Sequence, residues 1–152
     1  MLNDDDNNML SAFAAEGVEY LMIGAFAVAA YGLPPATGDM DLWVRPTPQN
    51  AKRIMRALRR FGAPMARLSK SDFATPDIVF QIGVAPRRID ILTSIAGVSF
   101  DKAWPVRAVQ NVGGTQVNGI SRDHLMVNKL AAGRPKDRAD VRALQRRKKK
   151  NG

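Results

Sequence analysis

Two aspartates one residue apart, Asp39 and Asp41, stand at the start of a stretch that has the pattern of a strand. Successive side chains of a strand point to opposite faces, so both aspartates share one face, roughly 6.5–7 Å apart. Met40 and the apolar residues that follow it at every second position face a core. Two carboxylates on one face repel each other and are costly to bury. A divalent cation between them removes that cost, so this spacing predicts a metal site.

A third carboxylate, Asp90, interrupts an otherwise apolar run at 88–92. An ionised aspartate in such a strand is unfavourable unless it is paired or bound to a metal. If this strand lies beside the first, all three carboxylates converge at one end of a sheet. Two ions of the Mg²⁺ type between three carboxylates suit nucleotidyl transfer. Asp90 is then placed to bind the acceptor-side ion and to serve as general base.

The composition limits which metals and which compartments are compatible with this chain. There is no cysteine and one histidine in 152 residues. Zinc–thiolate centres, disulfides and thiol nucleophiles are therefore excluded, and oxygen ligands favour Mg²⁺ or Mn²⁺. No apolar run approaches the ~20 residues of a membrane span. The N-terminus is acidic, unlike a signal peptide, so we expect a cytoplasmic protein without membrane contact.

The elements that must position these carboxylates follow from hydrophobic periodicity and from capping residues. The pattern predicts a mixture of strands and helices in one domain over residues 1–142, followed by a basic tail at 143–152. The expected class is α/β (α+β), with a mixed central β-sheet flanked by helices and a helical C-terminus. Strands are predicted at 20–23, 39–44, 78–82, 88–92, 106–111 and 115–118. Helices are predicted at 4–16, 25–31, 48–61, 100–104, 122–132 and 137–147.

Two further features point towards phosphate. Gly24 and Ala25 end one predicted strand and open a helix, and free backbone N–H groups at such a turn can receive phosphate oxygens. Residues 134–152 hold nine of the Lys and Arg residues against two acids, so most of the net charge of +9 lies in the C-terminal arm. Such an arm attracts RNA or DNA, although it can equally be a solvated tail that aids solubility.

These residues resemble the polymerase-β-like nucleotidyltransferase superfamily. Its signature is a Gly-Gly or Gly-Ser turn, a short helix, Asp-x-Asp on the next strand and a third Asp on a later strand. The block 128–141 resembles the Lys-x-x-Ala-x-Arg-x-Lys-Asp-x-x-Asp ending of minimal bacterial members, including AbiEii-type toxin nucleotidyltransferases. The first block is carried by Gly24, Ala25, Gly32, Thr37, Asp39 and Asp41.

The resemblance implies transfer of a nucleoside monophosphate from an NTP to an acceptor, with release of pyrophosphate. It implies RNA, with tRNA as the leading choice, as acceptor, and it raises an antitoxin as a partner. Two other readings stay open: a protein or small-molecule acceptor, and a catalytically degenerate module that binds nucleotide or RNA. The resemblance assigns the metals to Asp39, Asp41 and Asp90, and the nucleotide to Gly24, Ala25, Thr37, Lys129 and Lys136.

The sequence departs from the family pattern on the phosphate side. Ala25 stands where Ser or Gly is usual, which leaves a backbone N–H but no hydroxyl. Pro35 stands where many relatives carry an arginine. Arg87, Arg88 and Arg134 are the candidates to replace that positive charge.

Overall fold

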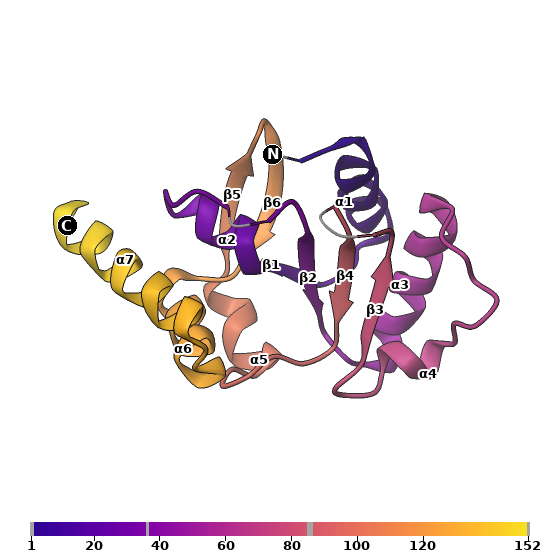
Figure 1. The fold of residues 1–152 in the computed structure, drawn as a ribbon. Coiled ribbons are helices and arrows are strands. Elements are labelled where there is room, and N and C mark those ends of the chain that lie inside the picture. Colours follow the sequence, from indigo (N-terminus) through magenta and orange to yellow (C-terminus); the bar gives the residue numbers. More distant parts are fainter. Residues whose placement is uncertain (1, 36, 85–86, 152) are drawn as a thin grey trace.

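The computed structural model describes residues 2–35, 37–84 and 87–151, with the side chains of 148–151 outside the description, so the predicted lysine-rich end is traced as backbone only. Its centre is a six-stranded mixed sheet in the order β3-β4-β2-β1-β6-β5 (Figure 1). The pairs β2–β4 and β1–β6 are parallel, and the other three are antiparallel. The strands are β1 (Tyr20–Ile23), β2 (Met40–Val44), β3 (Val79–Ile82), β4 (Ile89–Leu92), β5 (Ala108–Val112) and β6 (Thr115–Gly119).

Helices cover both faces of the sheet (Figure 1). One core joins α1 and α3 to the face that carries Met40, Leu42 and Ile91. A second core joins α5, α6 and α7 to the face that carries Trp43. The helices are α1 (Asp4–Glu16), α2 (Gly24–Ala30), α3 (Pro48–Phe61), α4 (Lys70–Phe73), α5 (Phe100–Ala103), α6 (Arg122–Ala132) and α7 (Pro135–Asn151), with a 3₁₀ turn η1 (Trp104–Val106) after α5.

This architecture confirms the predicted fold class. Most bounds lie within one residue of the expectation, and the larger differences have local reasons. Strand β5 begins at Ala108 because Pro105 lies in the preceding 3₁₀ turn. Helix α7 begins two residues early, because proline suits the first helical position, and it runs on through residue 142 to Asn151. The four-residue α4 was not expected from the sequence.

At the end of the β1–β2 pair opposite α2, one buried side-chain amide joins both strands to α3. Asn50, 1% exposed, accepts a hydrogen bond from the backbone N–H of Glu19 at 2.8 Å. Its Nδ2 donates to the carbonyl oxygens of Glu19 and Arg45, each at 3.0 Å. These bonds join the start of β1, the end of β2 and helix α3, and they hold the β1–β2 pair in register. Within the described residues no helix combines the length and apolar character needed to cross a membrane.

Candidate active site

The parallel pairing of β2 and β4 places Asp41 directly beside Asp90. Asp41 is also the register partner of Ile23, so the end of β1 lies on its other side. Ile89 and Ile91 lie in the first core, and strand alternation turns Asp90 to the other face. There Asp90 is only 7% exposed. The structure thus brings two of the three predicted carboxylates together at the start of their strands.

Burial and the neighbouring carboxyl group of Asp90 raise the pKa of Asp41. Burial first, then the charge of Asp90 and a hydrogen bond between the two carboxyl groups, and then the charge of Asp39, raise the pKa of Asp41 to about 7. The positive charge of Arg88 acts in the opposite direction. Burial disfavours the charged form of a carboxyl group, and a neighbouring negative charge adds to that effect. A positive charge close to Asp41 would therefore favour its ionised form.

Arg88 supplies positive charge to the other two carboxylates. Its Nε and Nη2 donate to the two oxygens of Asp90 at 2.6 and 3.0 Å. The same Nη2 lies 3.9 Å from Oδ2 of Asp39, and the backbone N–H of Arg88 donates to Oδ1 of Asp39 at 2.6 Å. The bidentate contact between Arg88 and Asp90 is among the stronger kinds of hydrogen-bonded ion pair. Arg88 therefore links Asp39 to Asp90, whereas Asp41 forms no ion pair with any Lys or Arg in the described part of the chain.

The absence of a side chain at Gly24 lets the Asp41 carboxylate approach its backbone closely. Gly24 has a φ of +72°, a conformation that side chains other than glycine rarely adopt. A Cβ atom built on Gly24 would stand 2.1 Å from Oδ2 of Asp41, which is far inside van der Waals contact. Helix α2 begins at Gly24, and its N-cap residue Ile23 offers no side chain to the first N–H groups. The carboxylate of Asp41 therefore packs directly against the backbone of this turn.

A cleft of about 410 Å³ opens above this turn. Gly24 and Asp41 form one side of it, and Lys129 and Arg134 from the α6–α7 region form the other. Ser94 and Asn128 complete its polar lining. A cleft of this volume is in the range of small-molecule sites. The arrangement places basic side chains opposite a carboxylate and a glycine turn.

The two basic groups of the cleft are already engaged with aspartates of α7. Nζ of Lys129, a residue only 7% exposed, lies 3.0 Å from Asp140 and 3.5 Å from Asp137. Arg134 donates to Asp137 at 2.7 and 3.2 Å. Burial raises the pKa of Asp137, but the hydrogen bonds and charge of Arg134, with the charge of Lys129, outweigh it and hold that pKa below its usual range. These pairs fasten α7 to α6 and fix the position of the Lys129 ammonium group.

The remaining predicted residues lie outside the lining of this cleft. Ala25 follows Gly24 in the first turn of α2. Thr37 is exposed, and its Oγ1 accepts a hydrogen bond from the N–H of Asp39 at 3.2 Å, which orders the entry to β2. Lys136 is exposed on α7. Asp39 and Asp90 lie beside the cleft in contact with Arg88.

The donor set suits one divalent cation better than two as the side chains now stand. Asp41 and Asp90 offer carboxylate oxygens side by side, and the raised pKa of Asp41 reflects its burial first and then the repulsion from Asp90, which a cation would relieve. Asp39 is turned towards the N–H of Arg88. Consistent with this, no three Asp, Glu or His side chains in the described ranges form a ready metal-binding group. A second ion would need Arg88 to release Asp39.

Arg88 contacts more of the site than the sequence indicates, since the sequence offers it only as one of three arginines that could replace a missing charge. The signal for Arg88 was available, since it lies two residues before Asp90 in a strand and must share its face.

Comparison with known proteins gives the family and the fold of this chain. A family model described as "Nucleotidyl transferase of unknown function (DUF2204)" matches residues 3–152. The chain belongs to this family. Among solved structures, a Thermotoga maritima protein described as a "putative nucleotidyltransferase" is similar, with a TM-score of 0.57 and 17% sequence identity. The match covers 92% of this chain and 89% of the other, and at that identity it shows a shared fold. No curated protein matches the chain.

The contact between Gly24 and Asp41 gives the first prediction. Gly24→Ala adds strain at a positive φ and also drives a methyl group into the Asp41 carboxylate. Gly17→Ala is a matched control, because Gly17 has a φ of +67° and nothing within 4 Å of its added Cβ. We expect Gly24→Ala to lower the free energy of unfolding by about 1–3 kcal/mol more than Gly17→Ala does. Urea denaturation measures both, and equal losses would contradict the close approach.

The raised pKa of Asp41 predicts how stability depends on pH. Because the folded state holds the proton more tightly than the unfolded chain, deprotonation favours unfolding. Without divalent ions, stability should fall as the pH rises from about 4, near the ordinary pKa, to about 7, and then level off. Asp41→Asn removes this titration. The free energy of unfolding of the variant, relative to that of the wild type, should therefore increase from pH 4 to pH 7. Urea denaturation in EDTA measures it, and parallel pH curves for the two proteins would refute it.

Proposed function

We propose that this protein transfers a nucleoside monophosphate from an NTP to a hydroxyl group of RNA, with tRNA as the leading candidate, and releases pyrophosphate. The observation that carries the proposal is the Asp41–Asp90 pair, set beside the Gly24 turn at the edge of a cleft with basic side chains. Membership in a nucleotidyl transferase family supports the reaction class.

In the proposed reaction the oxygen of the acceptor hydroxyl attacks the α-phosphorus of the NTP. The new P–O bond replaces the bond to the oxygen that bridges the α- and β-phosphorus atoms, and pyrophosphate leaves with that oxygen. The proton of the hydroxyl goes to a carboxylate, and Asp90 is the candidate base. Mg²⁺ or Mn²⁺, bound by oxygen ligands, would stabilise the negative charge on the phosphates and on the attacking oxygen.

The aspartates have distinct tasks in this scheme. Asp41 and Asp90 would hold the cation, since they are adjacent and share a hydrogen bond. Asp39 would join them once Arg88 moves, because Arg88 now contacts both Asp39 and Asp90. The freed guanidinium group would lie close to the phosphates, where a planar, permanently charged side chain binds oxyanions well.

The phosphate side of the cleft has its own residues. Backbone N–H groups at Gly24 and Ala25, in the first turn of α2, would donate to phosphate oxygens, and Gly24 allows the close approach. Lys129 and Arg134 face them across the cleft, and Lys136 and Thr37 lie further out. A triphosphate that enters here would compete with Asp137 and Asp140 for Lys129, which stands within 3.5 Å of both.

Helix α7 supports RNA as the acceptor. Four arginines on it are exposed: Arg138, Arg142, Arg146 and Arg147. Only two acids of the helix, Asp137 and Asp140, oppose them, and both face Lys129. A basic helix of this kind attracts the phosphate backbone without regard to sequence, and such binding weakens steeply with salt. An antitoxin that covers this helix would block the same surface.

Labelled transfer tests the proposal directly. Each α-³²P NTP is incubated with the protein, Mg²⁺ and either total RNA or RNase-treated lysate. We expect label in an RNA band with one preferred NTP, and we expect Asp41→Asn and Asp90→Asn to lower the rate by at least about 10²-fold, as losses of electrostatic stabilisation typically do. Asp5→Asn, an exposed change on α1, is the control and should leave the rate unchanged.

The outcomes separate the three readings. Label in protein or in a small molecule, and none in RNA, would replace the acceptor and keep the chemistry. Binding of NTP without transfer to any fraction, by protein shown to be folded, would leave a nucleotide-binding module. Transfer that survives both Asp41→Asn and Asp90→Asn would refute the assigned site.

A further inference from the structure

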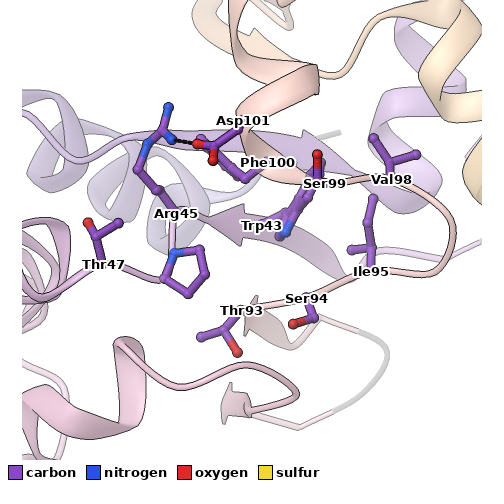
Figure 2. A pocket seen from close by; sticks show the side chains of 11 residues that line it. Trp43, Arg45, Thr47, Thr93, Ser94, Ile95, Val98, Ser99, Phe100 and Asp101 are labelled. Carbon is purple, nitrogen blue, oxygen red and sulfur yellow. Dashed lines mark hydrogen bonds and ion pairs between the residues drawn. The ribbon is translucent and has the colours of Figure 1, made fainter.

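A second hollow of about 390 Å³ adjoins the catalytic cleft. The two share Ser94 and Ile95, which follow β4. The second hollow is also lined by Trp43 and Arg45 (Figure 2). Trp43 lies two residues after Asp41 in β2, so both side chains are on the same face of the sheet. Because a strand rises about 3.3 Å per residue, the Cα atoms of Asp41 and Trp43 are separated by about 6.6 Å. We call this hollow the Trp43 pocket; it extends the cleft away from Gly24.

The floor of the Trp43 pocket is aromatic. Trp43 and Phe100 meet edge to face, with ring centroids 5.0 Å apart and planes inclined by 72°. Trp43 is 1% exposed and Phe100 5%, so both rings are fixed by the second core. In Figure 2 the indole of Trp43 lies between Arg45, Ser99 and Ser94. A rigid apolar floor of this kind suits a flat ring.

Polar groups around that floor have hydrogen-bonding capacity to spare. Nε1 of Trp43 is buried and has no hydrogen-bond partner in the described part of the chain. Ser99 is the N-cap residue of α5, yet its hydroxyl makes no capping bond there. The hydroxyl oxygen of Ser94 accepts from Asp77, which leaves its proton free to donate. A buried donor without a partner is unfavourable, and an acceptor atom in the pocket would offset that cost.

The charges of the Trp43 pocket exclude a phosphate as its natural occupant. Arg45 forms ion pairs with both Glu19 and Asp101. Its guanidinium also lies 4.8 Å from the centroid of the Phe100 ring. One positive charge therefore meets two negative charges, and an incoming phosphate would be repelled. A neutral, planar group with hydrogen-bonding edges fits this environment.

We propose that the Trp43 pocket receives the base of the donor nucleotide. The inference rests on the proposed function, which puts the triphosphate at Gly24, Lys129 and Arg134. A nucleotide has its charge at one end and a neutral heteroaromatic ring at the other. The connected clefts have the same polarity, with phosphate-binding groups at one end and an aromatic, charge-compensated pocket at the other. The base preference of the enzyme is then set by Trp43, Ser94 and Ser99.

Binding of nucleotides and of inorganic tripolyphosphate tests this assignment. Calorimetry with Mg²⁺ compares ATP, GTP, CTP, UTP and tripolyphosphate on three proteins. These are the wild type, Ser99→Leu, which fills the pocket, and Trp43→Phe, which keeps a smaller aromatic ring and removes Nε1. We expect Ser99→Leu to weaken the preferred NTP about tenfold or more, and Trp43→Phe to weaken it about fivefold, the effect of one lost hydrogen bond. Tripolyphosphate should bind all three proteins alike. Ser11→Leu, an exposed change on α1, is the control.

The alternatives give different results. If the wild type binds NTPs no more tightly than tripolyphosphate, or if Ser99→Leu and Trp43→Phe leave NTP affinity unchanged, the base lies elsewhere and the inference fails while the proposed function stands. If both variants keep NTP affinity and lose affinity for RNA, the pocket belongs to the acceptor, which also overturns the inference. If neither NTP nor tripolyphosphate binds the folded wild type, the proposed function fails, and the inference fails with it.

Discussion

The repulsion between Asp41 and Asp90 is the constraint around which the rest of the site is organised. Parallel pairing of β2 and β4 sets these residues side by side, and the core residues on either side of each keep the strands from slipping. A shift by one residue would turn both carboxylates into the first core and turn apolar side chains out. The fold therefore holds in place a pair of charges that, left to themselves, would separate.

Three neighbours make that arrangement tolerable. Arg88 forms an ion pair with Asp90, and its guanidinium group also lies close to the carboxylate of Asp39. Gly24 leaves room for the Asp41 carboxylate against the first turn of α2. The Lys129 contacts with Asp137 and Asp140 close the cleft from the side of α7. None of these neighbours forms an ion pair with Asp41, so its pKa stays raised, and the cation that we propose at this site would relieve the pair.

The sequence was most informative where local physics decides the outcome. Tyr20–Ile23 and Arg122–Ala132 form the predicted strand and helix without any shift, because a short buried run and a capped amphipathic segment carry their own signals. Asp90 was recognisable as a site residue because a carboxylate inside an apolar strand needs a partner. Helix α4 was missed because its four residues are too few to show a helical period.

What the sequence could not give are contacts between distant segments. Nothing local shows that the carboxylates of α7 bind Lys129, or that Thr37 orders a loop and stays out of the cleft. The Trp43 pocket likewise joins β2 to residues after β4 and around the start of α5. Such contacts depend on how the helices pack on the sheet. The hydrophobic pattern indicates which faces pack together, but it does not indicate which polar side chains come into contact as a result.

The most direct test of the central claim is titration of the wild type with Mn²⁺ at pH 7, without nucleotide, in two buffers of different ionisation enthalpy. Because the pKa of Asp41 is about 7, roughly half of the molecules hold a proton there, and a cation must displace it. We expect one ion bound, with release of roughly half a proton that disappears in Asp41→Asn. Absence of Mn²⁺ binding, or binding whose proton release is the same in Asp41→Asn, would contradict it.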